Sequence, residues 1–291
     1  MEAPFTSDFF RRLQQLKIKT RKTFLGSRQG IHRSRKKGQG LEFADYRQYT
    51  PGDDFRHIDW QVYARTDRMY VRQFREEQDL EVNVMIDSSP SMAFPVGKTK
   101  FELASNIALS LGFVALTDND SLRLSVLGQD VSPKYTGPQS APRAFRYLKK
   151  FKPDQNINFT ESVRAAISRQ KSPGKCYIIS DFMFELDEFI AGLDILKARN
   201  FDISVLQILS PNELVLDDSS ESLAVDSETG NEYRLVVNGD VRKKYQRLLK
   251  EHIAALENYC AKNAMGFVSC SSGEELSELV LGTFPKKGFL T

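Results

Sequence analysis

The spacing of hydrophobic and polar residues changes repeatedly along the chain, and after about residue 80 it alternates between two patterns. Short apolar runs, typical of buried strands, occupy residues 81–86, 122–127, 176–180, 202–209 and 266–270. Longer segments with helical periodicity occupy residues 100–117, 141–151, 160–170, 186–200, 241–263 and 274–281. Because strands and helices that alternate with short connections form βαβ units, the pattern predicts an α/β fold. We expect a doubly wound, mostly parallel sheet flanked by helices.

The region before residue 80 follows neither pattern for long and predicts separate parts. Residues 1–40 combine a short amphipathic helix at 6–19 with a basic arm punctuated by glycine. Residues 41–78 mix aromatic with charged residues around a Pro-Gly turn and predict a small β-rich appendage. Residues 79–291 would then form the main domain, with a β-hairpin insertion at about 222–237.

Positive charge is concentrated near the N-terminus. The whole chain has a formal net charge of +3, but residues 1–40 alone hold 11 Lys and Arg against 2 acidic residues. Because clustered basic residues attract phosphates, nucleic acid and anionic membrane surfaces are candidate ligands of this arm. The arm lacks the interleaved aromatic residues on which single-stranded nucleic acid stacks. We therefore expect no specific nucleic-acid binding and leave peripheral membrane association open.

Neither a membrane-spanning helix nor a secretory signal is expected. The longest apolar stretch, residues 107–117, is well short of the roughly 20 residues that span a bilayer. The N-terminus has no basic segment followed by an apolar run. Three cysteines, Cys176, Cys260 and Cys270, show no CxxC spacing and predict buried, reduced thiols rather than disulfides or a zinc site. These features predict a cytoplasmic protein.

Oxygen-bearing side chains follow two of the predicted strands. Asp87, Ser89 and Ser91 stand on alternate residues directly after the first strand, and Asp181 ends another strand. Thr160 stands where a loop enters a helix and could reach the same edge. Ligands of open parallel sheets bind outside the carboxyl ends of the strands. Five hard oxygen donors in that place predict a site for Mg²⁺, with Mn²⁺ or Ca²⁺ as alternatives.

Other interpretations of these residues stay open. Hydroxyl groups after a strand often cap the next helix or satisfy the backbone of a turn. The sequence GKT at 97–99 lacks the spacing of a phosphate-binding loop, and Thr99 with Glu102 better fits a helix cap. The chain has no GxSxG or HExxH motif. We expect no enzyme activity, with a metal-dependent hydrolase as the alternative.

The same residues carry a resemblance to known families. Asp87, Ser89, Ser91, Thr160 and Asp181, in this order on an α/β alternation, look like the metal-ion-dependent adhesion site (MIDAS) of von Willebrand factor A domains. Residues 38–92, GQGLEFADYRQYTPGDDFRHIDWQVYARTDRMYVRQFREEQDLEVNVMIDSSPSM, are similar almost throughout to the signature of the bacterial family called domain of unknown function 58 (DUF58). The chain is therefore identified as a member of that family.

The resemblance implies both a site and a role. Asp87, Ser89 and Ser91 would supply the core metal ligands, with Thr160 and Asp181 contributing directly or through water. The protein would be a non-enzymatic, metal-dependent protein-interaction module in the cytoplasm. Its expected partners are a MoxR-type AAA+ ATPase, for which it would act as an adaptor in protein maturation or complex assembly, and client proteins that offer an acidic side chain to the metal.

Two departures from the A-domain pattern accompany this resemblance. Phe182 follows Asp181 where many A domains carry glycine, and Phe159 rather than glycine precedes Thr160. Neither departure removes an oxygen donor.

Overall fold

The computed structural model describes residues 5–22, 42–75, 80–95, 97–154, 156–168, 170, 172–215, 222–225, 232–235 and 239–291. The chain divides into two compact units, one formed by residues 1–23 with 80–291 and the other by residues 24–79. The predicted basic arm, residues 25–40, lies outside the described residues. The predicted hairpin is described only in its two short strands, β9 (Ser222–Val225) and β10 (Glu232–Leu235), which pair antiparallel.

The main unit is built on a seven-stranded sheet in the order β11-β8-β7-β3-β4-β5, with β6 also paired to β4. Its strands are β3 (Glu81–Ile86), β4 (Ser121–Val126), β5 (Asp130–Val131), β6 (Tyr135–Thr136), β7 (Lys175–Ser180), β8 (Asp202–Leu209) and β11 (Gly266–Ser271). The pairs among β3, β4, β7, β8 and β11 are parallel, whereas β5 and β6 run antiparallel to β4. The predicted α/β fold with a mostly parallel sheet is confirmed.

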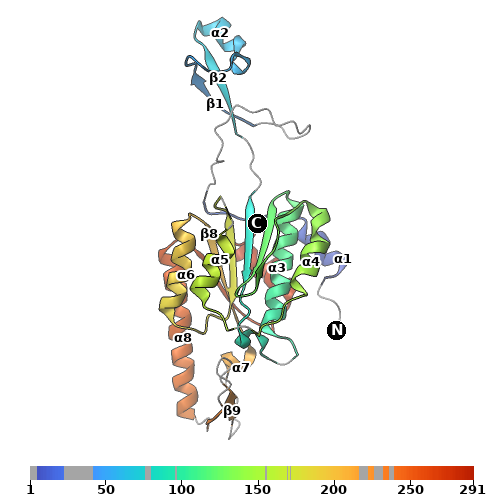
Figure 1. The fold of residues 1–291 in the computed structure, drawn as a ribbon, viewed down its shortest axis with the longest axis vertical. Coiled ribbons are helices and arrows are strands. Elements are labelled where there is room, and N and C mark those ends of the chain that lie inside the picture. The colour runs from blue at the N-terminus through green and yellow to red at the C-terminus, as the bar shows by residue number, and fades with distance from the viewer. Residues whose placement is uncertain are drawn as a thin grey trace. The chain divides into compact units, whose positions relative to one another are not determined.

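Helices cover both faces of this sheet (Figure 1). One face packs against α1 (Ser7–Leu13), α3 (Lys100–Thr117), α4 (Ala141–Leu148), α9 (Leu276–Glu278) and α10 (Phe284–Lys287). The other face packs against α5 (Phe159–Ile167), α6 (Leu186–Ala198) and α8 (Gly239–Lys262). Successive residues of β3 point to opposite cores, Val84 and Ile86 to the first and Met85 to the second. Double coverage explains why the central strands are continuous apolar runs.

None of the described helices is both long enough and apolar enough to cross a membrane. The longest, α8, has 24 residues but carries charged side chains along most of its length.

Local sequence signals set several element boundaries. Thr99 caps α3 by accepting a hydrogen bond from the backbone N–H of Glu102 at 3.0 Å, as the sequence predicts. The predicted helix at 100–117 and strand at 202–209 have the observed bounds. The C-terminal helix is less regular than predicted, because a π-helical turn, Leu279–Thr283, separates α9 from α10.

The N-terminal helix is shorter than its apolar pattern predicts. It ends at Leu13, six residues before the predicted end. The backbone N–H of Lys17 donates to the carbonyl of Thr291 at 2.8 Å, and the N–H of Thr291 donates back to the carbonyl of Lys17 at 3.0 Å. Ile18 and Leu290 face each other between these bonds and the bond from the Lys19 N–H to the Phe289 carbonyl, as an isolated antiparallel bridge. Tertiary pairing with the C-terminal residues therefore replaces the last turns of the helix.

The smaller unit contains a helix as well as the predicted strands. Its elements are β1 (Glu42–Gln48), a short 3-10 turn η1 (Phe55–His57), α2 (Trp60–Thr66) and β2 (Tyr70–Arg75), with β1 and β2 antiparallel. Asp59 organises the unit, because one carboxylate oxygen caps α2 while the other accepts from the Tyr46 hydroxyl and the Arg72 guanidinium, each at 2.8 Å. Tyr46, Arg72 and the start of α2 are thus all bound to the buried carboxylate of Asp59.

We expect the three cysteine thiols to be unreactive in the folded protein. Cys176, Cys260 and Cys270 are free and buried, and burial raises the pKa of Cys176 and Cys260 to about 12. Since the thiolate is the reactive species, Ellman's reagent at pH 8 should find none of the three before unfolding and all three in guanidinium chloride. Rapid labelling of any one of them in the native protein would contradict this placement.

Candidate functional site

The sheet order reverses between β3 and β7, and the predicted site lies at this position. From β3 the chain crosses to β4 on one side, and then returns to β7 on the other side of β3. Such a switch point opens a crevice at the carboxyl ends of the two strands, where doubly wound sheets bind ligands. Asp87 directly follows β3 and Asp181 directly follows β7. Their side chains are buried, so both carboxylates belong to the floor of the site.

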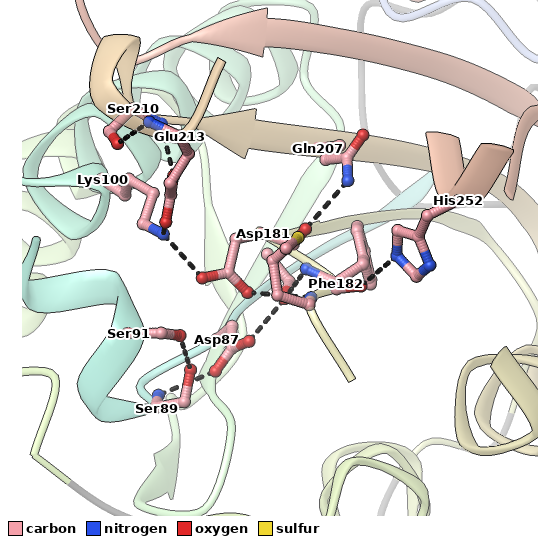
Figure 2. Close-up of polar contacts among 12 residues, drawn as sticks. Asp87, Ser89, Ser91, Lys100, Asp181, Phe182, Gln207, Ser210, Glu213 and His252 are labelled. Atoms are coloured by element: carbon pink, nitrogen blue, oxygen red, sulfur yellow. Dashed lines mark hydrogen bonds and ion pairs between the residues drawn. The ribbon is translucent and has the colours of Figure 1, made fainter. Parts of the chain in front are cut away.

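Asp87 is held by hydrogen bonds to both of its carboxylate oxygens (Figure 2). Oδ1 accepts the backbone N–H of Ser89 at 2.8 Å, and Oδ2 accepts the hydroxyl of Ser180, the last residue of β7, at 2.5 Å. Burial, and after it the negative charge of Asp181, raise the pKa of Asp87 to about 6. Two carboxylates are therefore kept close enough to repel each other in a site with little water.

The three serines after β3 have different roles. Figure 2 shows the side chains of Ser89 and Ser91 turned toward each other, with their Oγ atoms hydrogen-bonded at 3.0 Å. Ser91 belongs to a 3-10 turn, η2 (Pro90–Ala93), that begins with proline. Ser88 donates instead to the backbone carbonyl of Leu127 at 2.6 Å, so its hydroxyl is used at the end of β4. Alternate residues of the turn thus face the site.

Asp181 forms a buried ion pair that the sequence analysis did not predict. Its Oδ2 accepts from Nζ of Lys100 at 2.8 Å, and the same ammonium donates to Oε1 of Glu213 at 2.6 Å. Lys100 is the first residue of α3 and its side chain is fully buried. Glu213 lies in α7 (Pro211–Leu214), where it closes a capping box with Ser210. Three elements of the main unit therefore meet at one lysine.

The backbone after Asp181 is fixed by polar contacts on both sides. Nε2 of Gln207 donates to the Asp181 carbonyl at 2.9 Å, and a ring nitrogen of His252 is hydrogen-bonded to the Phe182 carbonyl at 2.7 Å. Phe182 has φ = 50°, in the left-handed region that favours glycine. Phenylalanine thus occupies a backbone conformation here that glycine would adopt with less strain. Its ring is fully buried and packs edge to face on Phe189, which offsets the strain.

Thr160 has a different environment from the other four predicted ligands. It lies in the first turn of α5, and its hydroxyl donates to the backbone carbonyl of Glu188 in α6 at 3.3 Å. The Glu188 carboxylate accepts the neighbouring backbone N–H of Phe159 at 2.7 Å. Among the contacts of the described residues, none joins Thr160 to Asp87 or Asp181. The structure brings Asp87, Ser89, Ser91 and Asp181 together and ties Thr160 to α6.

Lys100 and Glu213 are the site residues that the sequence analysis missed. A signal for Lys100 was present, because the first turn of a helix favours acidic residues and a lysine there is unusual. Glu213 was visible as the fourth residue of a Ser-Pro-Asn-Glu capping box. Neither signal predicts the ion pair between Lys100 and Glu213, since the two residues are 113 positions apart in the sequence.

Within the described part of the chain, no group of three or more His, Cys, Asp and Glu side chains gathers as a metal cage would. The donors at the switch point are instead two carboxylates and two hydroxyls.

Comparison with known proteins identifies the family of this chain. The family model described as "Protein of unknown function DUF58" matches residues 45–255. The chain belongs to the DUF58 family. Two curated relatives, uncharacterized protein Mb1516 of Mycobacterium bovis and uncharacterized protein Rv1480 of Mycobacterium tuberculosis, are each 27% identical to this DUF58 chain over 252 residues, which cover 83% of the chain and 78% of each relative.

Two solved structures are similar at low sequence identity. A conserved hypothetical protein BatB from Bacteroides thetaiotaomicron has a TM-score of 0.44 at 15% identity, covering 72% of this DUF58 chain and 98% of that protein. An aerotolerance-related membrane protein from Bacteroides fragilis has a TM-score of 0.38 at 16% identity, covering 58% and 87%. The fold of the DUF58 chain follows from its own strand order.

We expect Asp87→Asn to stabilise the metal-free protein at neutral pH. The pKa of Asp87 is about 6 in the folded state, against about 3.9 in an unfolded chain. Folding therefore takes up a proton between these values, and the free energy of unfolding falls as the pH rises through that window. A neutral asparagine avoids this loss, so the variant should gain up to about 3 kcal/mol over the unmodified protein at pH 7.5 and little at pH 4.

Urea unfolding of both proteins in EDTA at pH 4, 5, 6 and 7.5 measures this difference. A gap between the two free energies that fails to widen with pH would contradict the raised pKa of Asp87.

Proposed function

We propose that this chain is a non-enzymatic protein-interaction module that depends on a divalent cation. The ion would be Mg²⁺, with Mn²⁺ or Ca²⁺ as substitutes, and Asp87, Ser89 and Ser91 would hold it. The observation that carries the proposal is the meeting of two buried carboxylates and two hydroxyls at the switch point of the sheet. That is the edge at which doubly wound sheets bind ligands.

The chemistry of these donors fits a hard divalent cation. Mg²⁺ and Ca²⁺ take oxygen ligands, and the described residues of the site offer carboxylate and hydroxyl oxygens. Asp87 and Asp181 repel each other in a buried place, which is why the pKa of Asp87 is raised. A cation between them would relieve this repulsion. The Thr160 hydroxyl donates its proton to the Glu188 carbonyl, which leaves the oxygen lone pairs of Thr160 available, but none of its described contacts is with the other four donors.

The neutral hydroxyls matter for what the site can recognise. When bound, a divalent ion held by one aspartate and two serines retains positive charge that an acidic side chain of a partner can meet. Ser89 and Ser91 supply oxygen without supplying negative charge. Ser88 and Ser180 keep the turn and the Asp87 carboxylate in place through their own hydrogen bonds. The chain's residues would thus position the ion and leave one side of it accessible.

The partner class follows from the resemblance to DUF58 proteins. We propose a MoxR-type AAA+ ATPase as partner, with this chain acting as an adaptor in protein maturation or complex assembly in the cytoplasm. Either that ATPase or a client protein would provide the acidic side chain.

The serines of the turn provide a matched test of the metal site. Ser89→Ala removes a proposed ligand and should weaken Mn²⁺ binding at least about tenfold. Ser88→Ala removes only the bond to the Leu127 carbonyl, so it should cost about 1 kcal/mol of stability and leave Mn²⁺ affinity unchanged. Isothermal titration with Mn²⁺ measures both variants. Equal losses of affinity in the two would refute this division of roles.

Partner binding tests the function directly. We expect the unmodified protein to capture a MoxR-type ATPase from the same genome in the presence of Mg²⁺. Capture should be lost in EDTA and in Asp87→Ala, whereas Ser88→Ala should behave as the unmodified protein. Capture that survives both chelation and the Asp87 substitution would rule out a metal-dependent mechanism.

A further inference from the structure

A buried ammonium group lies beside the proposed metal ligands without being one of them. Lys100 donates to Asp181 at 2.8 Å and to Glu213 at 2.6 Å. Its side chain is fully buried, and it occupies the first position of α3. Burial and the positive end of the helix dipole both disfavour a cation at this place. Two carboxylates surround the charge there.

A second buried lysine shows what a purely structural pair looks like in this protein. Lys175, at the start of β7, donates to Asp202 at 2.8 Å, and both side chains are almost fully buried. The other oxygen of Asp202 accepts the backbone N–H of Lys22, so this pair fastens the N-terminal segment to the sheet. Lys175 and Asp181 lie at opposite ends of the β7 segment, about 20 Å apart at roughly 3.3 Å per residue.

Lys100 also limits how Asp181 can act. Oδ2 of Asp181 is held by the ammonium, and Oδ1 accepts the backbone N–H of Met183 at 3.3 Å. Both oxygens already have partners in the protein. Asp87 also has a partner on each oxygen, but those partners are a neutral N–H and a neutral hydroxyl, whereas Asp181 is paired with a cation. The negative charge of Asp181 is therefore partly cancelled within the protein, and that of Asp87 is not.

We propose that Lys100 is the internal counter-cation of the site: it weakens the binding of the divalent ion, and it keeps the loaded site from carrying a net negative charge that would repel an acid. This inference rests on the proposed metal-dependent function. The site holds three carboxylates and one ammonium, which together carry two net negative charges when all four groups are ionised. These groups belong to Asp87, Asp181, Glu213 and Lys100. A bound divalent ion would cancel the two net negative charges. Without Lys100 the loaded site keeps one negative charge and repels an acidic ligand.

Charge-changing variants test the first half of this inference. Lys100→Met should bind Mn²⁺ about tenfold or more tightly than the unmodified protein, because a nearby positive charge is removed. Glu213→Gln should bind about tenfold more weakly, because it removes a negative charge and leaves Lys100 in place. The double variant should return to within about threefold of the unmodified protein. Lys175→Met is the control, and should lose stability without changing Mn²⁺ affinity.

Isothermal titration with Mn²⁺, after folding is checked by circular dichroism, separates the outcomes. If the unmodified protein binds Mn²⁺ and neither single variant changes its affinity in the stated direction, the inference on Lys100 is overturned and the metal site stands. If neither the unmodified protein nor Lys100→Met binds Mn²⁺, the proposed function and the inference both fail. Should Lys100→Met not fold, the Glu213→Gln result alone decides.

A small acid tests the second half. With Mn²⁺ loaded to the same occupancy, the methyl proton signal of added acetate should broaden with the unmodified protein and with Lys175→Met, because acetate contacts the paramagnetic ion. Broadening should be at least about threefold smaller with Lys100→Met, since the loaded site then carries a negative charge. Equal broadening in all three proteins would overturn the role of Lys100 in keeping the loaded site from repelling an acid.

Discussion

Two carboxylates buried at the ends of neighbouring parallel strands are the constraint around which the main unit is arranged. Asp87 and Asp181 raise each other's electrostatic energy, because little water reaches either of them. Hydrogen bonds from Ser180 and the Ser89 backbone stabilise Asp87, and the Lys100 ammonium stabilises Asp181. These three groups come from different elements. The strand order matters for the site because it makes these ends neighbours.

The cost of this arrangement is spread over places that look unrelated in the sequence. A lysine begins α3, where an acidic residue would suit the helix better. Phe182 adopts a backbone conformation that glycine would adopt with less strain. Each of these local conflicts lies beside Asp181. Natural proteins accept such conflicts at functional sites and compensate for them elsewhere, here by ion pairing and by the packing of the Phe182 ring.

Periodicity predicted the sheet, its order of elements and most helix positions, because these depend on local alternation of apolar and polar residues. The N-terminal helix came out too long, since hydrogen bonds from Lys17 to Thr291 end it and no local signal reveals them. For the site, Asp87, Ser89, Ser91 and Asp181 could be found from strand ends alone. Lys100 could not be assigned to the site from the sequence, because its partners Asp181 and Glu213 lie 81 and 113 positions further along the chain. The hydrogen bond from Thr160 to the Glu188 carbonyl in α6 is likewise a tertiary contact that the local sequence does not reveal.

The pairing of residues 17–19 with residues 289–291 bears on how the main unit is made in the cell. On a translating ribosome the N-terminal segment emerges first and its partners emerge after every strand of the sheet. The hydroxyl of Tyr177, in the centre of that sheet, donates to the Phe289 carbonyl, so this hydrogen bond also forms only after the C-terminal residues have been made. The pairing of the N-terminal segment therefore cannot form before residues 289–291 have been synthesised, whereas β3 and β4 pair with each other without them.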